Sequence, residues 1–369
     1  MTTASTPQFH KLRVAHIEPQ TAFGMAVSLD VPPELRAAYR FVAGQFVTLR
    51  FALNGQDVRR AYSICQSTPD FERSGLLRVG IKRVIGGLVS NHVNDTVRVG
   101  HVMDVMTPDG RFHTPLETSN SNHYLGIAGG SGITPLLSLV ATTLALEPNS
   151  RFTLLYGNRS TNQTMFAEDL QNIKDSHMAR FSLINVMSDE DQGTDILNGL
   201  LDRAKISDLL SRLVHVDTIN DVFVCGPAPM MDGAEAALLD AGVDPAHVHI
   251  ERFGSFTPAA VLPDVTDDTP AASLTFVIDG KQRHTRVAYT TDDGQTNDTV
   301  LEAGLRTGVA LPFSCKAGNC CTCRAKVLSG EVRMIKNFAL NAQEVADGFV
   351  LTCQCVPVSN HITISFDER

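Results

Sequence analysis

Cys315-Lys316-Ala317-Gly318-Asn319-Cys320-Cys321-Thr322-Cys323 places Cys315, Cys320 and Cys323 in one short loop, and Cys353 follows after a gap of 29 residues. This C-x4-C-x2-C…C spacing is typical of the plant-type ligand set of a 2Fe-2S cluster. A loop can bring three thiolates to one cluster only where the main chain turns tightly, and Gly318 permits such a turn. The sequence therefore predicts a 2Fe-2S cluster on Cys315, Cys320, Cys323 and Cys353, and a chain that carries electrons.

A structural zinc site is the main alternative for these cysteines. Such a site usually uses two close pairs, as in C-x2-C with a second C-x2-C. This chain has only the pair Cys320 and Cys323, since Cys353 and Cys355 are separated by a single residue. A Rieske centre replaces two cysteines by histidines, and no histidine lies within residues 315–323. We favour the 2Fe-2S cluster and keep zinc as the alternative.

The composition is that of a globular protein with several domains. The chain has 369 residues, 43% of them hydrophobic and 19% charged, which suits two or three folded domains. A net charge of -9, without dense lysine or arginine runs, argues against nucleic acid or a membrane surface as partner. The first residues lack the apolar core of a secretory signal, and the apolar stretch 133–146 is too short to span a membrane. We expect a cytoplasmic protein with reduced thiols.

Three patterns follow one another along the chain. Short apolar runs between turn residues, from Phe41 to about Met106, predict a small antiparallel barrel. From Tyr124 to Arg252 strand and helix signals alternate, which predicts a parallel sheet with covering helices. Prolines and aspartates then indicate an extended linker, and a third domain follows it. The expected bounds are 1–116, 117–256, 257–272 for the linker and 273–369.

A flavin would connect a cluster to a nicotinamide coenzyme, because a cluster takes one electron at a time and the coenzyme gives up two as a hydride. Arg60, Tyr62 and Ser63 lie in the run R-A-Y-S on a predicted barrel strand. There they could direct a cation at phosphate, an aromatic face at the flavin and a hydroxyl near its N5 atom, which makes Ser63 a catalytic candidate. In isolation the run would also fit an ordinary strand.

The next element predicts a pyrophosphate site. Gly86 and Gly87 form a turn before a predicted helix that contains Ser90 and Asn91. Main-chain N–H groups at such a helix start suit a pyrophosphate, which favours FAD over FMN. A plain helix start capped by Ser90 or Asn91 is the alternative.

Residues 129–135, Gly-Gly-Ser-Gly-Ile-Thr-Pro, connect a predicted strand to a predicted helix. Gly129, Gly130 and Gly132 permit close approach of the main chain to a phosphate. We expect Thr134 to cap the helix and Pro135 to occupy its first position. The turn is not a complete G-x-G-x-x-G, but its place between strand and helix predicts a nucleotide site.

The following strand leads into Gly157-Asn158-Arg159-Ser160 and lacks the acidic residue that holds a free ribose 2′-hydroxyl. Arg159 suits a 2′-phosphate instead, so we favour NADPH over NADH. Arg159, Ser160 and Lys82 are candidate cofactor-binding residues. A solvated surface arginine is the alternative reading of Arg159.

The last candidates follow two later strands. Cys225, Gly226 and Pro227 come at the carboxyl end of a predicted strand, where ligands bind in open parallel sheets. Cys225 is a second catalytic candidate that could lie against the nicotinamide, although alone it is better read as a small buried hydrophobe. Glu251 and Phe253 could approach the flavin, or could be a solvated acid and a core side chain.

These segments, in this order, resemble the ferredoxin-NADP reductase superfamily: R-x-Y-S at 60–63, G-G-x-x-S at 86–90, G-G-S-G-I-T-P at 129–135 and C-G-P at 225–227. With the C-terminal cysteine motif, the chain looks like the reductases that feed oxygenases from one polypeptide. The resemblance implies a multidomain fold with an antiparallel β-barrel flavin domain, an α/β parallel-sheet nucleotide domain and an α+β β-grasp ferredoxin domain. It also implies FAD contacts for Arg60 and Ser63, and a nicotinamide site near Cys225, Gly226 and Pro227.

Further stretches are similar to the reductase subunits of ring 1,2-phenylacetyl-CoA epoxidases: 59–65, 155–159, 336–340 and 348–354. This likeness implies a multisubunit di-iron oxygenase that acts on phenylacetyl-CoA as electron acceptor, with NADPH, as inferred from Arg159, as electron donor. Asn319 and Cys321 depart from the usual pattern of the cluster loop. A reductase for another oxygenase, such as a steroid hydroxylase, and a redox-sensing module remain as alternatives.

Overall fold

The computed structural model describes residues 7–253, 271–288 and 299–368. They fall into two compact units, one within Gln8–Arg252 and one within Phe253–Arg369. The expected linker, 257–272, lies outside the described residues except for Ala271 and Ala272, which begin a strand. No helix in the described ranges is long and apolar enough to cross a membrane.

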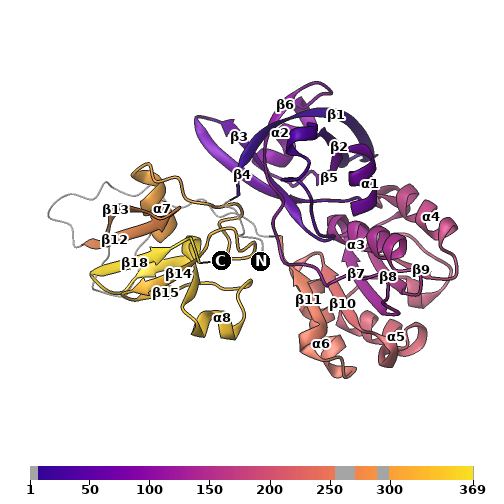
Figure 1. Cartoon of the computed structure of the whole chain (residues 1–369). Helices are drawn as coiled ribbons and strands as arrows, with labels where there is room; N and C mark the ends of the chain where they lie inside the picture. The colour runs from indigo at the N-terminus through magenta and orange to yellow at the C-terminus, as the bar shows by residue number, and fades with distance from the viewer. Residues whose placement is uncertain (1–6, 254–270, 289–298, 369) are drawn as a thin grey trace. The chain divides into compact units, whose positions relative to one another are not determined.

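The first part of the unit Gln8–Arg252 is a six-stranded antiparallel sheet in the order β4-β3-β6-β1-β2-β5 (Figure 1). A bridge between Ile64 and Val79 joins its two edges, so the sheet closes as the expected barrel. The strands are β1 (Phe9–Thr21), β2 (Gly24–Asp30), β3 (Phe46–Leu53), β4 (Gln56–Ser63), β5 (Leu76–Lys82) and β6 (Val102–Met106), with α1 (Thr68–Ser74) and α2 (Leu88–Thr96) beside them.

The barrel begins earlier than the sequence pattern indicated. Strands β1 and β2 precede Phe41 and occupy the middle of the sheet. In β1 only Leu12 and Val14 are fully buried, and charged or polar residues separate them, so the apolar signal of this strand is weak. The strand expected from Phe41 begins later than predicted, at Phe46.

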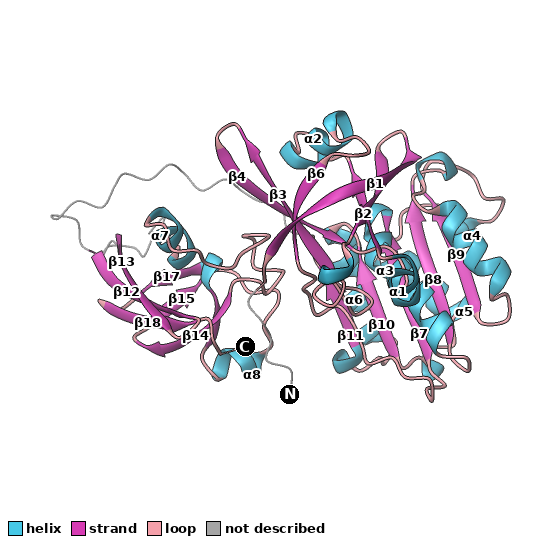
Figure 2. Cartoon of the chain, turned by 45° about the horizontal axis from the view of Figure 1, so that its top comes forward, coloured by secondary structure: helices cyan, strands magenta, loops and turns pink. Residues whose placement is uncertain are grey.

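The second part of this unit is a five-stranded parallel sheet in the order β11-β10-β7-β8-β9, visible side by side in Figure 2. Its strands are β7 (His123–Gly129), β8 (Arg151–Asn158), β9 (Phe181–Met187), β10 (Asp221–Cys225) and β11 (Val248–Glu251). Its helices are α3 (Ile133–Leu146), α4 (Ala167–Ser176), α5 (Arg203–Leu213) and α6 (Ala228–Asp240).

Helices cover both faces of the parallel sheet. Alternate strand residues such as Tyr124 and Phe152 pack in one cluster with α3 and α4, and Leu125 and Leu155 pack in another with α5 and α6. The chain runs outward from β7 through β8 and β9, then returns to place β10 on the other side of β7. The strand order therefore reverses between β7 and β10, the position at which open α/β sheets bind ligands.

The unit within Phe253–Arg369 has a mixed five-stranded sheet in the order β13-β12-β18-β14-β16. The strands are β12 (Ala271–Ile278), β13 (Lys281–Ala288), β14 (Arg324–Ser329), β16 (Phe349–Leu351) and β18 (His361–Ser365), and a second small sheet pairs β15 (Val332–Met334) with β17 (Cys355–Pro357). Helix α7 (Val300–Arg306) packs its buried Val300, Leu301 and Ala303 on Phe276 and Ile364, and α8 (Ala342–Ala346) precedes β16. This is the expected α+β fold.

Candidate cofactor sites

The four cysteines of the motif meet in the unit within Phe253–Arg369. Cys315, Cys320 and Cys323 lie in the loop before β14, and Cys353 lies in the turn after β16. The thiols make two side-chain contacts, Cys315 with Cys320 and Cys323 with Cys353. Cys320, Cys323 and Cys353 are at most 7% exposed. The sequence spacing thus brings the four predicted ligands together as two pairs.

The loop geometry suits a thiolate at Cys315, whereas the neighbouring thiols and burial raise the pKa of Cys320 and of Cys323. A hydrogen bond from the Cys320 thiol lowers the pKa of Cys315 to about 6, with help from main-chain N–H groups, although burial opposes it. The N–H of Ala317 donates to Cys315 Sγ at 3.3 Å, and the N–H of Cys315 donates to Cys320 Sγ at 3.5 Å. Lys316, Gly318 and Cys321 all have left-handed backbone (φ 52°, 81° and 57°), which wraps the loop around this point.

Gln354 connects the distant cysteine to the loop. Its Nε2 atom donates to the carbonyl oxygen of Lys316 at 3.0 Å and lies 3.8 Å from Cys353 Sγ. The hydroxyl of Thr352 donates to the carbonyl oxygen of Cys323 at 3.0 Å. The residue on each side of Cys353 is therefore bonded to the segment that carries the other three cysteines.

This donor set fits two metal atoms better than one. Two pairs of thiols match a 2Fe-2S cluster, in which four thiolates are shared between two irons. The residues present therefore fit the cluster.

The two unusual loop residues have different surroundings. Cys321 donates its thiol to the carbonyl oxygen of Ala339 at 3.4 Å, so it has a partner outside the four-cysteine set. Asn319 has a buried Oδ1 atom with no hydrogen-bond partner within the described residues. The sequence singled out both positions but not these contacts.

The predicted flavin residues lie on β4. Arg60 and Tyr62 point to one face of the strand because they are two residues apart, and Ser63 points to the other, where it is 3% exposed. Burial lowers the pKa of Arg60 and raises that of Tyr62, and the Arg60 charge opposes the rise at Tyr62. A half-buried cation beside an aromatic ring could contact a phosphate and a flavin ring, respectively.

The predicted pyrophosphate turn lies between β5 and α2. Gly86 has φ 72° with open space where a side chain would be, and Gly87 donates its N–H to the carbonyl oxygen of Val84 at 2.9 Å. Ser90 does not cap the helix. Its Oγ accepts from the Val84 N–H at 3.1 Å, and no side chain caps the helix at Gly87. The first N–H groups of α2 are therefore open to an anion.

The nucleotide turn differs from its expected form. Gly130–Gly132 make a short 3-10 turn and α3 begins at Ile133, so Pro135 is the third helical residue and not the first. The hydroxyl of Thr134 donates to the carbonyl oxygen of Ser131 at 3.0 Å and does not cap the helix. Thr134 is 2% exposed and packs on Gly80 of the barrel, which turns its hydroxyl back into the turn.

The turn after β7 touches the turn after β10. A β-carbon on Gly129 would stand 2.7 Å from atoms of Pro227 and Met230, and one on Gly226 would stand 3.0 Å from the N atom of Gly129. Only glycine fits at these contacts. Gly129 and Gly132 thus meet Gly226 and Pro227 at the point where the strand order reverses.

Two cations lie beside this turn. The Nζ atom of Lys82, at the end of β5, would be 3.3 Å from a β-carbon on Gly130. Burial lowers the pKa of Lys82, and the nearby charge of Arg159 lowers it further. Arg159 follows β8 with an exposed side chain, and Ser160 comes next, its hydroxyl donating to Asn162 Oδ1 at 2.7 Å. Lys82 and Arg159 repel each other, so an anion between them would be favoured.

Sequence reasoning missed one carboxylate near this position. Glu190, after β9, accepts hydrogen bonds from the N–H and the hydroxyl of Thr161 at 2.7 and 2.6 Å. These bonds lower the pKa of Glu190. Glu190 is 29 residues from Thr161 in the chain, so only the pairing of β8 with β9 brings an acid beside the Arg159 segment.

The remaining candidates lie at the ends of β10 and β11. Cys225 is 0% exposed, and burial, followed by the charge of Glu251, raises its pKa well above the usual range. Cys225 and Glu251 are register partners. Phe253, which follows β11, is 46% exposed and is not a core side chain.

Comparison with known families divides the chain into three matching regions. Residues 25–114 match the oxidoreductase FAD-binding domain, residues 127–236 the oxidoreductase NAD-binding domain, and residues 283–358 the 2Fe-2S iron-sulfur cluster binding domain. The prediction of an FAD domain, a nicotinamide-coenzyme domain and a 2Fe-2S domain, in this order along the chain, is therefore confirmed, and the preference for NADPH stays a prediction.

Whole-chain relatives have the same organisation. The chain is 38% identical to a component of 1,2-phenylacetyl-CoA epoxidase from Escherichia coli over 98% of both chains. It is 32% identical to the ferredoxin reductase component of 3-ketosteroid-9-alpha-monooxygenase from Mycobacterium tuberculosis, over 97% of this chain and 96% of the relative. Phthalate dioxygenase reductase shares the fold, with a TM-score of 0.58, 22% identity, and coverage of 97% and 98% of the two chains.

Proposed function

This chain belongs to the family of oxygenase reductase components, and from that premise we propose that it passes electrons from NADPH to a multisubunit di-iron oxygenase that epoxidises phenylacetyl-CoA. The observation that carries the proposal is the 38% identity to a phenylacetyl-CoA epoxidase component across 98% of both chains. That the chain is an oxidoreductase with FAD-, NAD- and 2Fe-2S-binding domains follows from the family matches themselves.

A flavin takes up the two electrons of a hydride and releases them singly, which matches a two-electron donor to a one-electron carrier. We propose that Arg60, Tyr62, Ser63, Gly86, Gly87 and Ser90 bind FAD, and that Gly129, Gly130, Gly132 and Thr134 receive the coenzyme pyrophosphate. Cys225, Gly226, Pro227, Glu251 and Phe253 would surround the nicotinamide and flavin rings. The proposed domain bounds are 1–116, 117–256 and 273–369, with 257–272 between the last two.

The residues of the chain mainly position and neutralise charge, and no general acid or base is needed for hydride transfer. Gly129 and Gly226 keep the turns after β7 and β10 in contact, so one ligand can touch both. The open N–H groups at the start of α2 and the Arg60 cation would balance the charge of a pyrophosphate. Burial of Ser63 and Cys225 would exclude water from the reacting rings.

The preference for NADPH rests on Lys82 and Arg159. Both are cationic, Lys82 lies beside Gly130 of the nucleotide turn and close enough to Arg159 for their charges to interact, and Arg159 has the place in which an arginine receives a 2′-phosphate. Glu190 is the observation that favours NADH, because a carboxylate in this region can hold a ribose hydroxyl. The two bonds to Thr161 leave acceptor sites on that carboxylate free, and we favour NADPH because of the two cations.

A cytoplasmic location fits this function. None of the eight cysteines, which all lie within the described residues, forms a disulfide, and this agrees with a reducing compartment. The proposed pathway is phenylacetate breakdown, in which the aromatic substrate binds to the oxygenase and not to this chain.

The second candidate function is the reductase of a steroid hydroxylase, favoured by the 32% identity to a ketosteroid monooxygenase reductase. The two functions separate when the purified chain is mixed with each oxygenase and its substrate. We expect coenzyme oxidation coupled to product only with the phenylacetyl-CoA epoxidase. Coupling only with the steroid enzyme would overturn the first candidate.

An anaerobic titration tests the electron path itself. NADPH should bleach the flavin absorbance and then produce the EPR signal of a reduced 2Fe-2S cluster, and NADH should do so more slowly. Flavin bleaching with no cluster signal would leave a simple flavin reductase. A redox-sensing module predicts no sustained NADPH oxidation with a one-electron acceptor.

A further inference from the structure

One face of β5 meets the parallel-sheet region of the same unit at three positions. Arg78, Gly80 and Lys82 are two residues apart and so share a face of the strand. Lys82 approaches Gly130, and Gly80 leaves room for Thr134 and Phe166. Arg78 reaches Asp169 in the first turn of α4. The contacts of Lys82 with Gly130 and of Gly80 with Thr134 involve the nucleotide turn. The contact of Arg78 with Asp169 has no role in binding a cofactor that would explain it.

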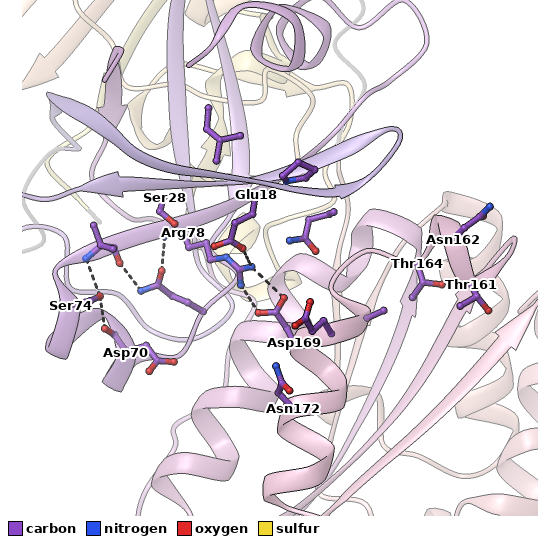
Figure 3. Close-up of a pocket in the computed structure, with 17 residues that line it drawn as sticks. Glu18, Ser28, Asp70, Ser74, Arg78, Thr161, Asn162, Thr164, Asp169 and Asn172 are labelled. Atoms are coloured by element: carbon purple, nitrogen blue, oxygen red, sulfur yellow. Dashed lines mark hydrogen bonds and ion pairs between the residues drawn. The ribbon is translucent and has the colours of Figure 1, made fainter. Parts of the chain in front are cut away.

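The guanidinium of Arg78 bridges two carboxylates on different elements (Figure 3). Its Nη2 atom lies 2.6 Å from Glu18 Oε2, on β1 of the barrel. Its Nη1 and Nη2 atoms lie 2.7 and 3.3 Å from the two oxygens of Asp169, which makes this second pair forked. The Arg78 side chain is 15% exposed and that of Asp169 is 30% exposed, so solvent screens the pair less than it screens surface pairs.

A cavity of about 910 Å³ surrounds this ion pair. Its walls come from both regions, including Pro19 and Gln20 of β1, Leu76 of β5 and Asn172 of α4, and they are more polar than apolar. Leu170 of α4 is buried in one apolar cluster with Ala26 and Cys65 of the barrel region. Apolar packing of this kind is not directional, so the Arg78–Asp169 pair adds a directional contact between α4 and the barrel.

The backbone conformation of Phe166 is independent evidence that the contact between the barrel and the parallel-sheet region imposes a specific geometry. It has left-handed backbone (φ 58°), which is unfavourable for a residue with a bulky side chain, yet it is only 1% exposed. Its N–H donates to Gln20 Oε1 of β1 at 3.0 Å, and the Arg78 Cζ atom lies 5.2 Å from the centre of its ring. Barrel residues thus hold Phe166 in a conformation that it would not adopt alone.

We propose that the Arg78–Asp169 ion pair fixes the orientation of the parallel-sheet region on the barrel and thereby sets the distance for hydride transfer. Arg78 and Asp169 are positioning residues and do not touch the coenzyme or the flavin. Hydride transfer is steeply sensitive to the distance between the reacting atoms, so a small rotation of the sheet would slow the reaction without weakening coenzyme binding. The inference rests on the hydride-transfer step alone and does not depend on which oxygenase is the partner.

Asp169→Asn tests the proposal in the full-length protein loaded with its cofactors. Two matched controls separate the effects of the change. Glu18→Gln removes the other carboxylate of the same arginine, within the barrel, and Glu168→Gln removes a charge from the same turn of α4 without touching an Arg78 pair. Arg78→Lys keeps the charge and loses the fork, and it serves if Asp169→Asn does not fold.

Stopped-flow reduction of the flavin by NADPH gives the first readout. We expect the limiting rate constant of Asp169→Asn to fall by between about fivefold and a hundredfold, while its coenzyme dissociation constant changes less than about twofold. Both controls should stay within about twofold of the unaltered chain in both quantities. Equal limiting rates for Asp169→Asn and Glu18→Gln would overturn the proposal.

Amide hydrogen exchange gives a second readout that does not require turnover. The N–H of Phe166 should exchange at least about tenfold faster in Asp169→Asn than in Glu168→Gln, because its bond to Gln20 depends on the same orientation. Unchanged exchange would also contradict the proposal. If the unaltered chain shows no flavin reduction with either coenzyme, the proposed function fails, and the exchange comparison still decides the role of the ion pair.

Discussion

Gly132 lies directly against the main chain of Cys225: a β-carbon on Gly132 would stand 2.0 Å from the Cys225 carbonyl oxygen. Gly132 has ordinary helical backbone (φ -61°), so the contact, and not its conformation, requires glycine. The contact joins the turn after β7 to the turn after β10.

Gly132→Ala should therefore separate the two turns. Forcing a methyl group into main-chain atoms costs about 1–3 kcal/mol, and the coenzyme would lose contact with one turn. We expect weaker NADPH binding and slower flavin reduction, measured by stopped-flow absorbance. The chemically reduced cluster should keep its EPR signal because it belongs to the other unit, and an altered signal would contradict this explanation.

Cys353→Ser should remove the cluster and leave flavin reduction by NADPH intact, because the four cysteines share no residue with the nucleotide turns. Absorbance and EPR of the reduced protein measure the two centres separately. Cys355→Ala is the matched control, since Cys355 is fully buried two residues away and is not in the ligand set. Loss of flavin reduction in Cys353→Ser would mean that the cluster supports the whole fold.

Arg159→Ala should weaken the binding of NADPH but not of NADH. Hydrogen bonds to charged groups contribute about 1.5–3 kcal/mol, which corresponds to roughly tenfold to a hundredfold in KM. Arg151→Ala is the control, because Arg151 is exposed at the opposite end of the same strand. Equal losses with both coenzymes would remove the case for a 2′-phosphate contact.

Cys321→Ser should keep the cluster, because Cys321 donates to Ala339 and serine can donate in the same way. We expect unchanged iron content and EPR line shape. Loss of iron would identify Cys321 as a ligand and would require a different assignment of the four.

The stability of the parallel-sheet region should fall in mild acid because of His123. Burial lowers the pKa of His123 to about 4, while an unfolded histidine titrates near 6.5. Between these values the unfolded chain binds more protons, so the free energy of unfolding rises with pH from about 4 to 6.5 and is lost on acidification. The loss due to His123 is of the order of 2 kcal/mol.

The hydrogen-bond partners of His123 determine which of its ring nitrogens carries the proton in the neutral form. Thr218 donates its hydroxyl to the carbonyl oxygen of His215 at 2.7 Å, so its oxygen can only accept from Nδ1 of His123, at 2.8 Å. The Thr153 hydroxyl then donates to Nε2 at 2.9 Å. Chemical unfolding followed by circular dichroism at pH 7 and pH 4.5 should show a smaller difference for His123→Gln than for the unaltered chain. Equal differences would refute the assignment.

Short sequence patterns were enough to predict the sites that are formed by residues close together in the chain. The cysteine spacing and Gly318 define one loop, and the glycines at 129–132 define one turn, so the four-cysteine set and the nucleotide turn could be read from a few neighbouring residues. Two predicted details that depend on packing were wrong. Thr134 packs on Gly80 and does not cap α3, and α3 begins at Ile133, two residues before the predicted first position at Pro135.

Contacts between distant residues could not be read from the sequence. Arg78 and Asp169 are 91 positions apart, and neither belongs to a motif. Lys82 approaches Gly130 only because β5 faces the turn after β7. The strand β1, which lies inside the sheet, was missed because its alternation of apolar and polar residues is weak. Only two of its residues, Leu12 and Val14, are fully buried.

The four cysteines lie within Phe253–Arg369, and the turns after β7 and β10 lie within Gln8–Arg252, so neither of these two sets of residues is divided between the units. A genetic crossover between these units would carry each set of ligands whole into a new gene. Gene recombination at this boundary is then an evolutionary route by which a cluster-binding unit can be joined to a different reductase, since each unit keeps all of its ligand residues.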